Sequence, residues 1–236
     1  MKKELMTTLV LSLLLFGCSN KTTSSETTSK SSQATTQTVT TQSTTSTTVA
    51  TTQNNPTPRG MADTSLGLDI VVNKKHALPA DYAPGENPTA VAQLKKLIHK
   101  MQELGYPINN SYSGYRSYEY QTKLYNNYVA QEGKKAADTY SARPGYSEHQ
   151  TGLAFDILDS SGNLLEGDQY KDAIHWLHTH AHEYGFIVRF QEGKEAITGY
   201  IPEAWHLRYV GDRATEIYNS GLSLEEYFGV AGGDYE

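Results

Sequence analysis

A polar, low-complexity tract between residues 19 and 58 limits how much of this 236-residue chain can fold into a compact domain. The tract consists almost wholly of Ser, Thr, Gln and Asn, with hardly any large apolar residue. Such a segment cannot bury enough apolar surface to offset the entropy that is lost on ordering. We therefore expect a flexible tether over residues 18–58 and a single folded domain over residues 59–236.

The first 17 residues have the pattern of a signal peptide. Lys2 and Lys3 precede an apolar run at residues 9–16, which is shorter than the ~20 residues that a membrane-spanning helix needs. The run ends at Gly17-Cys18, which resembles the lipobox of bacterial lipoproteins, and Cys18 is the only cysteine of the chain. A buried thiol is the alternative, but a cysteine beside a polar tract has nothing to pack against. We expect a lipid on Cys18, which anchors the chain to the outer face of the cytoplasmic membrane, and no disulfides.

Residues 59–236 carry helix and strand signals in succession. Asn87-Pro88 gives a cap and a proline at the first helical position, apolar residues follow at helical spacing, and Gly105 ends the pattern. Ser117 and Gly133 bracket a second helix in the same way. The patterns predict helices at about 88–104, 117–131 and 168–184, and strands at 108–115, 153–158, 186–190 and within 199–209. Helices early and strands late, with the strands joined by glycine-containing loops, predict an α+β domain whose helices pack on a small antiparallel sheet.

The segment from Ser147 to Asp156 carries the strongest chemical signal. His149 lies seven residues before Asp156, which is placed in an apolar strand where an unpaired carboxylate is costly. Further along, Glu203 precedes His206 by three residues. Each of these residues taken alone is more often structural than a metal ligand. Together, three nitrogen and oxygen ligands leave a fourth zinc position open for water, as in catalytic zinc sites, and a nearby carboxylate can take the proton of that water.

The full pattern, Ser-x-His-x-x-Gly-x-Ala-x-Asp followed by Glu-x-Trp-His, resembles the zinc D-alanyl-D-alanine carboxypeptidases of the VanY type and their LdcB-type L,D-carboxypeptidase relatives, those of pneumococcal type most of all. The resemblance extends from the first helix to about Gly211. It implies Zn²⁺ held by His149, Asp156 and His206, with Glu203 as the catalytic base.

A second segment, Ser113-Gly114-Tyr115-Arg116-Ser117, matches the Ser-x-Tyr-Arg-Ser segment of the family. The resemblance implies that Arg116 binds or polarises the substrate near the scissile bond. A guanidinium can hold a terminal carboxylate or stabilise an oxyanion. Four more residues are candidates for contact with the peptide: Tyr115, Ser117, Gln121 and Ser147.

The substrate that the resemblance implies is the stem peptide of peptidoglycan, which loses its C-terminal D-alanine. A D,D-enzyme cuts the pentapeptide between two D-alanines, whereas an L,D-enzyme cuts the tetrapeptide between the L-diamino acid and its D-alanine. The lipoprotein organisation and the run at residues 141–146 favour the L,D-enzyme. An endopeptidase and a non-catalytic peptidoglycan-binding module are the alternatives, and the second is disfavoured because both Glu203 and Arg116 are present.

Charge and composition bear on partners. The net charge is −6 and no basic patch suggests a nucleic acid as a partner. We expect a monomer that works in the space of the cell wall.

Four histidines crowd the predicted helix at residues 168–184. His178 and His182 are four residues apart, a spacing at which helical histidines can bind zinc. The pattern His-Glu-x-x-His is missing, however, because Tyr184 and Gly185 follow Glu183. We interpret the histidines of this segment as part of a solvated polar face.

Overall fold

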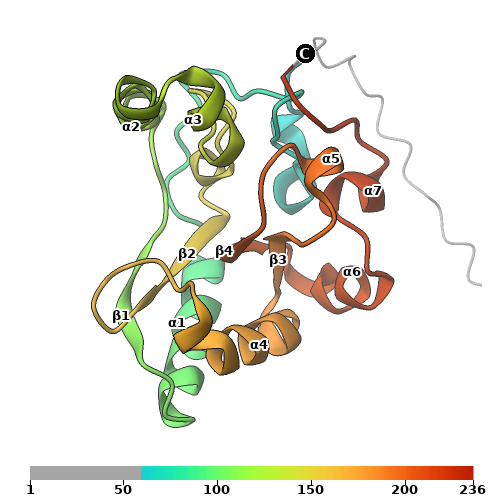
Figure 1. Cartoon of the computed structure of the whole chain (residues 1–236). Coiled ribbons are helices and arrows are strands. Elements are labelled where there is room, and N and C mark those ends of the chain that lie inside the picture. The colour runs from blue at the N-terminus through green and yellow to red at the C-terminus, as the bar shows by residue number, and fades with distance from the viewer. Residues whose placement is uncertain (1–59, 236) are drawn as a thin grey trace, which may run out of the picture. The chain divides into compact units, whose positions relative to one another are not determined.

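The computed structural model describes residues 60–235, so the predicted signal peptide, Cys18 and the tether lie outside the described residues. Within them lies a four-stranded antiparallel sheet with the strand order β1-β2-β4-β3. The strands are β1 (Ile108–Ser113), β2 (Ala154–Asp159), β3 (Phe186–Phe190) and β4 (Glu203–Tyr209). The α-helices are α1 (Pro88–Glu103), α2 (Tyr118–Glu132), α3 (Lys134–Tyr140), α4 (Lys171–His180), α5 (Glu195–Thr198), α6 (Ala214–Ser220) and α7 (Leu224–Phe228). Figure 1 shows the strands at the centre, with α1 and α4 on one side and α2 and α3 together on the other.

Helix α1 forms where its sequence signals place it. The side chain of Asn87 accepts a hydrogen bond from the backbone N–H of Ala90 at 3.0 Å, which satisfies one of the donors left free at a helix N-terminus. Leu94, Leu97 and Met101 lie on one face and are fully buried in the core beneath the sheet. Burial of each such side chain contributes about 1.5–3 kcal/mol.

The alternation of side chains along the strands separates the core from the site. In β2, Phe155 and Ile157 belong to the core, so Asp156 points to the opposite face. In β4, Leu207 belongs to the core and His206 points the other way. The two strands place the core on one face of the sheet and the polar side chains on the face toward α2 and α3.

The predicted α+β fold with an antiparallel sheet is confirmed, and the structure adds detail. The predicted helix at 168–184 is three pieces: a 3-10 turn at Asp168–Tyr170, α4, and a second 3-10 turn at Ala181–Tyr184. The prediction lacked α3 and the short helices α5, α6 and α7, and the order of helices first and strands last was wrong because α6 and α7 follow β4. Among residues 60–235, none of the helices has the length and apolar character needed to cross a bilayer.

Candidate metal centre

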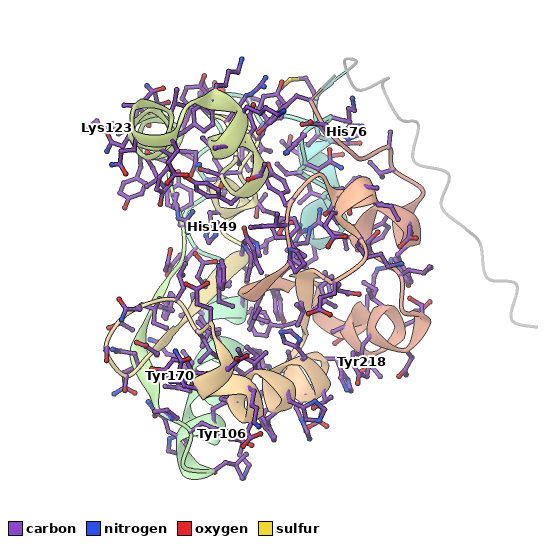
Figure 2. The ribbon with its side chains drawn as sticks, in the orientation of Figure 1. His76, Tyr106, Lys123, His149, Tyr170 and Tyr218 are labelled. Carbon is purple, nitrogen blue, oxygen red and sulfur yellow. The ribbon has the colours of Figure 1, made fainter. Side chains whose placement is uncertain are left out.

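His149, Asp156 and His206 converge on one point on the polar face of the sheet. Their ligand atoms all lie within 4.8 Å of one another, and all three side chains are buried. Asp156 Oδ1 lies 3.3 Å from His149 Nε2 and 3.4 Å from His206 Nδ1. Asp156 and His206 are paired directly across β2 and β4, and His149 comes from a 3-10 turn at Glu148–Thr151. Figure 2 shows His149 in the middle of the molecule, between α2 and α3 and the strands.

Gly152 ends this turn and brings the chain into β2. Its backbone has φ +70°, in the left-handed region, and a Cβ at this position would lie 1.8 Å from the carbonyl oxygen of Gly85. Only glycine satisfies both conditions. The glycine of the motif therefore fixes the path between His149 and Asp156.

Hydrogen bonds outside the cluster orient both imidazole rings. His149 Nδ1 lies 2.8 Å from the carbonyl oxygen of Gly114, and His206 Nε2 lies 3.2 Å from Glu148 Oε2. Both partners are acceptors only, so each of these ring nitrogens carries a proton. The other nitrogen of each ring, Nε2 of His149 and Nδ1 of His206, faces Asp156 and is the nitrogen that can offer a lone pair to a metal.

The buried carboxylates of the cluster favour the binding of a cation. Asp156 Oδ1 is buried and has no hydrogen-bond donor among the described residues. Burial alone would lower the pKa of His206, but its hydrogen bonds to Glu148 and Glu203 outweigh burial and raise the pKa to about 9. Burial and the nearby charge of Arg116 lower the pKa of His149. Once a cation displaces the Nδ1 proton of His206, two neutral imidazoles and one carboxylate surround one point, a set of ligands that fits Zn²⁺ and leaves a coordination position free.

Glu203 lies beside this cluster at the start of β4. Its Oε2 is 3.3 Å from His206 Nδ1, and the side chain is almost completely buried. Burial raises the pKa of Glu203 above its ordinary value. A carboxylate whose pKa is shifted toward neutrality is a better proton acceptor at neutral pH.

Arg116 reaches the cluster from the segment between β1 and α2. Its Nη2 donates to Ser113 Oγ at 2.9 Å and to Asp156 Oδ2. Asp156 therefore directs one oxygen to the guanidinium and the other to the two histidines. The side chain of Arg116 is 21% exposed, which leaves part of the guanidinium open to the cavity.

A cavity of about 540 Å³ opens above the cluster. Its lining includes the three candidate ligands, Glu203 and Arg116, and two predicted substrate contacts, Gln121 and Ser147. Gln121 donates to the carbonyl oxygen of Ala142 at 2.7 Å, and its own Oε1 has no donor among the described residues.

The two other predicted contacts have different surroundings. Ser117 caps α2 by accepting from the N–H of Tyr120, and the N–H of Tyr115 donates to Glu86. Neither is among the described residues that line the cavity. Contact of Tyr115 or Ser117 with the substrate stays a prediction.

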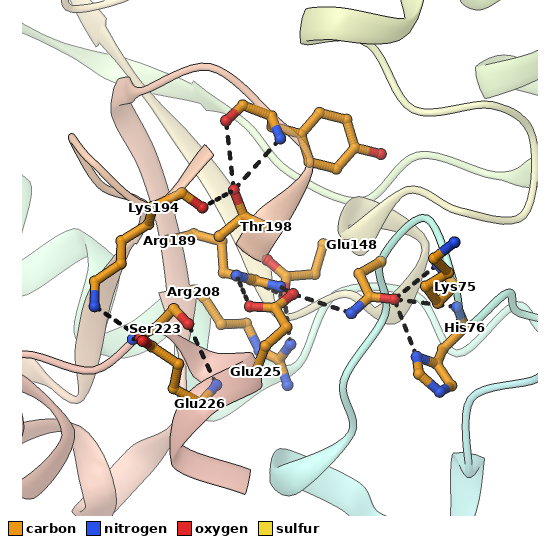
Figure 3. Close-up of polar contacts among 12 residues, drawn as sticks. Lys75, His76, Glu148, Arg189, Lys194, Thr198, Arg208, Ser223, Glu225 and Glu226 are labelled. Carbon is orange, nitrogen blue, oxygen red and sulfur yellow. Dashed lines mark hydrogen bonds and ion pairs between the residues drawn. The ribbon is translucent and has the colours of Figure 1, made fainter. Parts of the chain in front are cut away.

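Sequence reasoning missed Glu148, whose Oε2 faces His206. Its other carboxylate oxygen belongs to a buried network of charges, in which Figure 3 shows Glu148 beside Arg189, Arg208 and Glu225. Its Oε1 accepts from Arg189 Nε and Arg208 Nη1, each at 2.8 Å. Arg189 also makes a bidentate pair with Glu225 of α7, at 2.9 and 2.6 Å. The signal was present in the sequence: two arginines inside the apolar strands β3 and β4 need buried carboxylates as partners.

The histidines of α4 and of the 3-10 turn at Ala181–Tyr184 form no second metal site among the described residues. His178 Nε2 lies 3.1 Å from the carbonyl oxygen of Ala204, and His182 Nδ1 lies 3.1 Å from Thr215 Oγ1. The ring of His182 stacks on Tyr218, at 4.2 Å between centroids. The expectation of a solvated face was wrong for His178 and His182, which are partly buried and packed, whereas His175 is exposed.

A known protein family matches the part of the chain that contains the residues of the candidate metal centre. The family described as VanY, D-alanyl-D-alanine carboxypeptidase, matches residues 85–212, more than half of the chain. The chain belongs to the VanY family. The matched range contains every candidate ligand, Glu203 and Arg116, whereas Glu225 lies outside it.

Three relatives show the range of this VanY group. A D-alanyl-D-alanine carboxypeptidase of Enterococcus faecalis is 37% identical over 182 residues, which are 67% of this chain and 64% of that protein. The crystal structure of an L,D-carboxypeptidase, DacB of Streptococcus pneumoniae, is 62% identical with a TM-score of 0.68, over 71% of this chain and 89% of that one. A vancomycin resistance D,D-pentapeptidase VanY in complex with Zn(II) is 35% identical with a TM-score of 0.57, over 69% of this chain and 98% of that one. The chain thus spans about two thirds of the curated relative's length.

Proposed function

We propose that this chain is a zinc carboxypeptidase that removes the C-terminal D-alanine from peptidoglycan stem peptides. The observation that carries the proposal is the convergence of His149 Nε2, Asp156 Oδ1 and His206 Nδ1 on one buried point. Membership of the VanY family and the Zn(II) in a solved relative support Zn²⁺ as the ion. When bound, Zn²⁺ supplies a Lewis acid that polarises the scissile carbonyl and acidifies water.

The residues of the chain divide the remaining work between them. Glu203 takes a proton from the attacking water and delivers it to the departing amine of D-alanine. The guanidinium of Arg116, partly open to the cavity, stabilises the negative charge that develops on the carbonyl oxygen or holds the terminal carboxylate. Glu148 and the carbonyl of Gly114 hold the two histidines in the tautomer that presents a lone pair.

The tetrapeptide is the substrate we favour, with cleavage between the L-diamino acid and D-alanine. The 62% identity with the L,D-carboxypeptidase DacB, against 35% with the D,D-pentapeptidase, supports this choice. The test is incubation of the zinc-loaded chain with tetrapeptide and pentapeptide in separate reactions, with the loss of one alanine followed by mass spectrometry. Loss from the tetrapeptide is the expected result, and loss from the pentapeptide alone would assign the D,D-reaction instead.

We further propose that the chain works as a monomer, anchored by a lipid on Cys18 to the outer face of the cytoplasmic membrane. The signal-like run before Cys18 and the polar tether after it support the anchor. Mass spectrometry of the purified protein should show the lipid at Cys18. Cys18→Ala should move the protein from the membrane fraction to the soluble exported fraction, and an unchanged distribution would contradict the anchor.

A further inference from the structure

The segment Gly232–Tyr235 lies beyond the residues that match the family and packs against α5 and Gly199, which follows it. The N–H of Gly233 donates to the carbonyl oxygen of Ile197 at 2.6 Å. A Cβ on Gly232 would lie 2.1 Å from that same oxygen, and a Cβ on Gly199 would lie 2.5 Å from the carbonyl oxygen of Gly233. The two stretches of backbone therefore approach so closely that only glycine fits at these positions.

This close fit places Tyr235 against the segment that leads into the metal centre. The hydroxyl of Tyr235 accepts from the backbone N–H of Arg143 at 2.8 Å, and the guanidinium of Arg143 lies 3.7 Å from the centre of the tyrosine ring. Tyr146, three residues later, packs edge-on against the same ring at 5.2 Å. Arg143 is itself held by a two-fold hydrogen bond to Asp138 of α3.

Tyr235 also contacts a second residue that lines the cavity, Tyr200. Its hydroxyl lies 3.5 Å from the hydroxyl of Tyr200, and the buried ammonium of Lys74 lies over both rings, at 5.1 Å from Tyr235 and 4.6 Å from Tyr200. Tyr200 packs on Phe190, which in turn packs on the ring of His206. Tyr146 and Tyr200 both line the cavity above the metal centre, so Tyr235 lies behind the cavity wall and touches two of its members.

We infer that Tyr235 is a positioning residue for the substrate: it fixes Tyr146 and Tyr200 in the cavity wall and thereby sets the affinity for the stem peptide. This inference rests on the proposed function, because it takes the cavity to be the peptide site. Tyr235 touches none of the candidate ligands, Glu203 or Arg116 in the described structure. Its removal should therefore weaken substrate binding and leave the chemical step and the metal intact.

Three substitutions in the full-length chain test the inference. Tyr235→Ala removes the ring, Tyr235→Phe removes only the hydroxyl, and Gly232→Ala displaces the segment while keeping the tyrosine. For Tyr235→Ala and Gly232→Ala we expect KM for the tetrapeptide to rise about tenfold, kcat to stay within about twofold, and zinc content to stay at one per chain. Tyr235→Phe should be intermediate, because the ring contacts with Arg143 and Tyr146 remain.

A matched control is Tyr218→Ala, which removes a tyrosine stacked on His182 and should leave KM unchanged. Calorimetric binding of tetrapeptide to the inactive Glu203→Ala protein, with and without Tyr235→Phe, gives a reading that does not need turnover. A lack of turnover by the unmodified chain would overturn the proposed function alone. The ratio of the Kd values of the Glu203→Ala protein with and without Tyr235→Phe would still show whether Tyr235 affects peptide binding. Unchanged KM and Kd in the folded variants, or a fall of kcat with loss of zinc at unchanged KM, would overturn the inference.

Discussion

At the scale of single residues, hydrogen-bond partners and neighbouring charges give the two buried histidines of the cluster different pKa values. His149 and His206 are both buried, yet the first donates to a backbone carbonyl and the second to a carboxylate within reach of two others. The pKa of His149 is lowered, mainly by burial, while that of His206 is raised to about 9. A cation bound between them replaces the proton that His206 otherwise holds. The cluster is therefore expected to release a proton when it takes up metal.

Glu203→Ala should abolish measurable release of D-alanine. A positioned general base contributes about 10²–10⁴-fold to the rate, and no other carboxylate of the cluster is free for this role. Zinc content, measured by elemental analysis, should stay at one per chain because the three ligands remain. Glu119→Ala on the exposed side of α2 is the control and should retain full activity. Substantial turnover by Glu203→Ala would remove Glu203 from the mechanism.

Glu148→Gln should weaken zinc binding by about 10–100-fold, the usual effect of losing a partner that orients a ligand. An amide nitrogen in place of Oε2 would direct its N–H groups at Nε2 of His206. This favours the tautomer with the proton on Nδ1, the nitrogen that faces the proposed metal. Competition with a chromophoric chelator measures the affinity. Glu119→Gln makes the same chemical change on the surface and should leave it unaltered. Equal affinities for the Glu148 and Glu119 variants would show that the tautomer of His206 is set elsewhere.

At the scale of elements, Asn87→Ala tests how much the N-terminal cap of α1 contributes to the stability of the fold. The substitution removes the side-chain acceptor of the Ala90 N–H and should lower the free energy of unfolding by about 1 kcal/mol. Urea unfolding followed by circular dichroism gives the difference. Asn127→Ala, on the exposed side of α2, is the matched control and should be neutral or slightly stabilising, since alanine has the higher helix propensity.

Local signals account for the elements that the sequence predicted well. Asn87-Pro88 and Ser117 mark the starts of α1 and α2, and the apolar run of β3 is bounded as observed. Helices α5, α6 and α7 are four to seven residues long, too short to show a helical period. The direct pairing of Asp156 with His206 is a contact between distant segments, which no local pattern encodes. Motif chemistry indicated the candidate ligands, whereas the pairing of their strands and the contacts of Glu148 could be seen only in the fold.

Replacing both His178 and His182 by glutamine should leave activity and the single zinc of the chain nearly unchanged. These side chains bond to Ala204 and Thr215 and belong to no metal cluster of the described residues. Glutamine can keep one hydrogen bond at each position. Elemental analysis together with the rate of D-alanine release checks the outcome, and loss of a second equivalent of zinc would show that these histidines bind metal after all.

At the scale of the whole molecule, one buried charge network joins the site to both flanks of the family-matched region. Asn73 donates to Glu225 at 3.0 Å, Glu225 pairs with Arg189, and Arg189 and Arg208 together hold Glu148. Two carboxylates balance two guanidinium groups, so the network is neutral as a unit. Removing one of these four charged side chains leaves an uncompensated buried charge, which costs about 3–5 kcal/mol. The flanking segments therefore stabilise Glu148, the residue that orients the candidate ligand His206.

This network predicts how the stability of the metal-free protein depends on pH. Burial alone would raise the pKa values of Glu148 and Glu225, but the arginine charges outweigh burial and hold both below the ordinary value of 4.5. Between the depressed folded pKa and 4.5, the unfolded chain binds more protons than the folded one, so acid favours unfolding. The stabilisation from these carboxylates should be fully present above about pH 5 and fall as the pH decreases below 4.5.

The measurement is urea unfolding of the chelator-treated chain at a series of pH values, since loss of zinc on histidine protonation would otherwise add its own pH dependence. Glu225→Gln removes one of the two depressed carboxyl groups and should flatten the decline below pH 4.5 while lowering stability at pH 7. Glu119→Gln should leave the profile below pH 4.5 closer to that of the parent chain. If the free energy of unfolding of the Glu225 variant fell below pH 4.5 as steeply as that of the parent chain, carboxylates outside the network would control stability at low pH. The network would then not contribute to stability through its carboxylates.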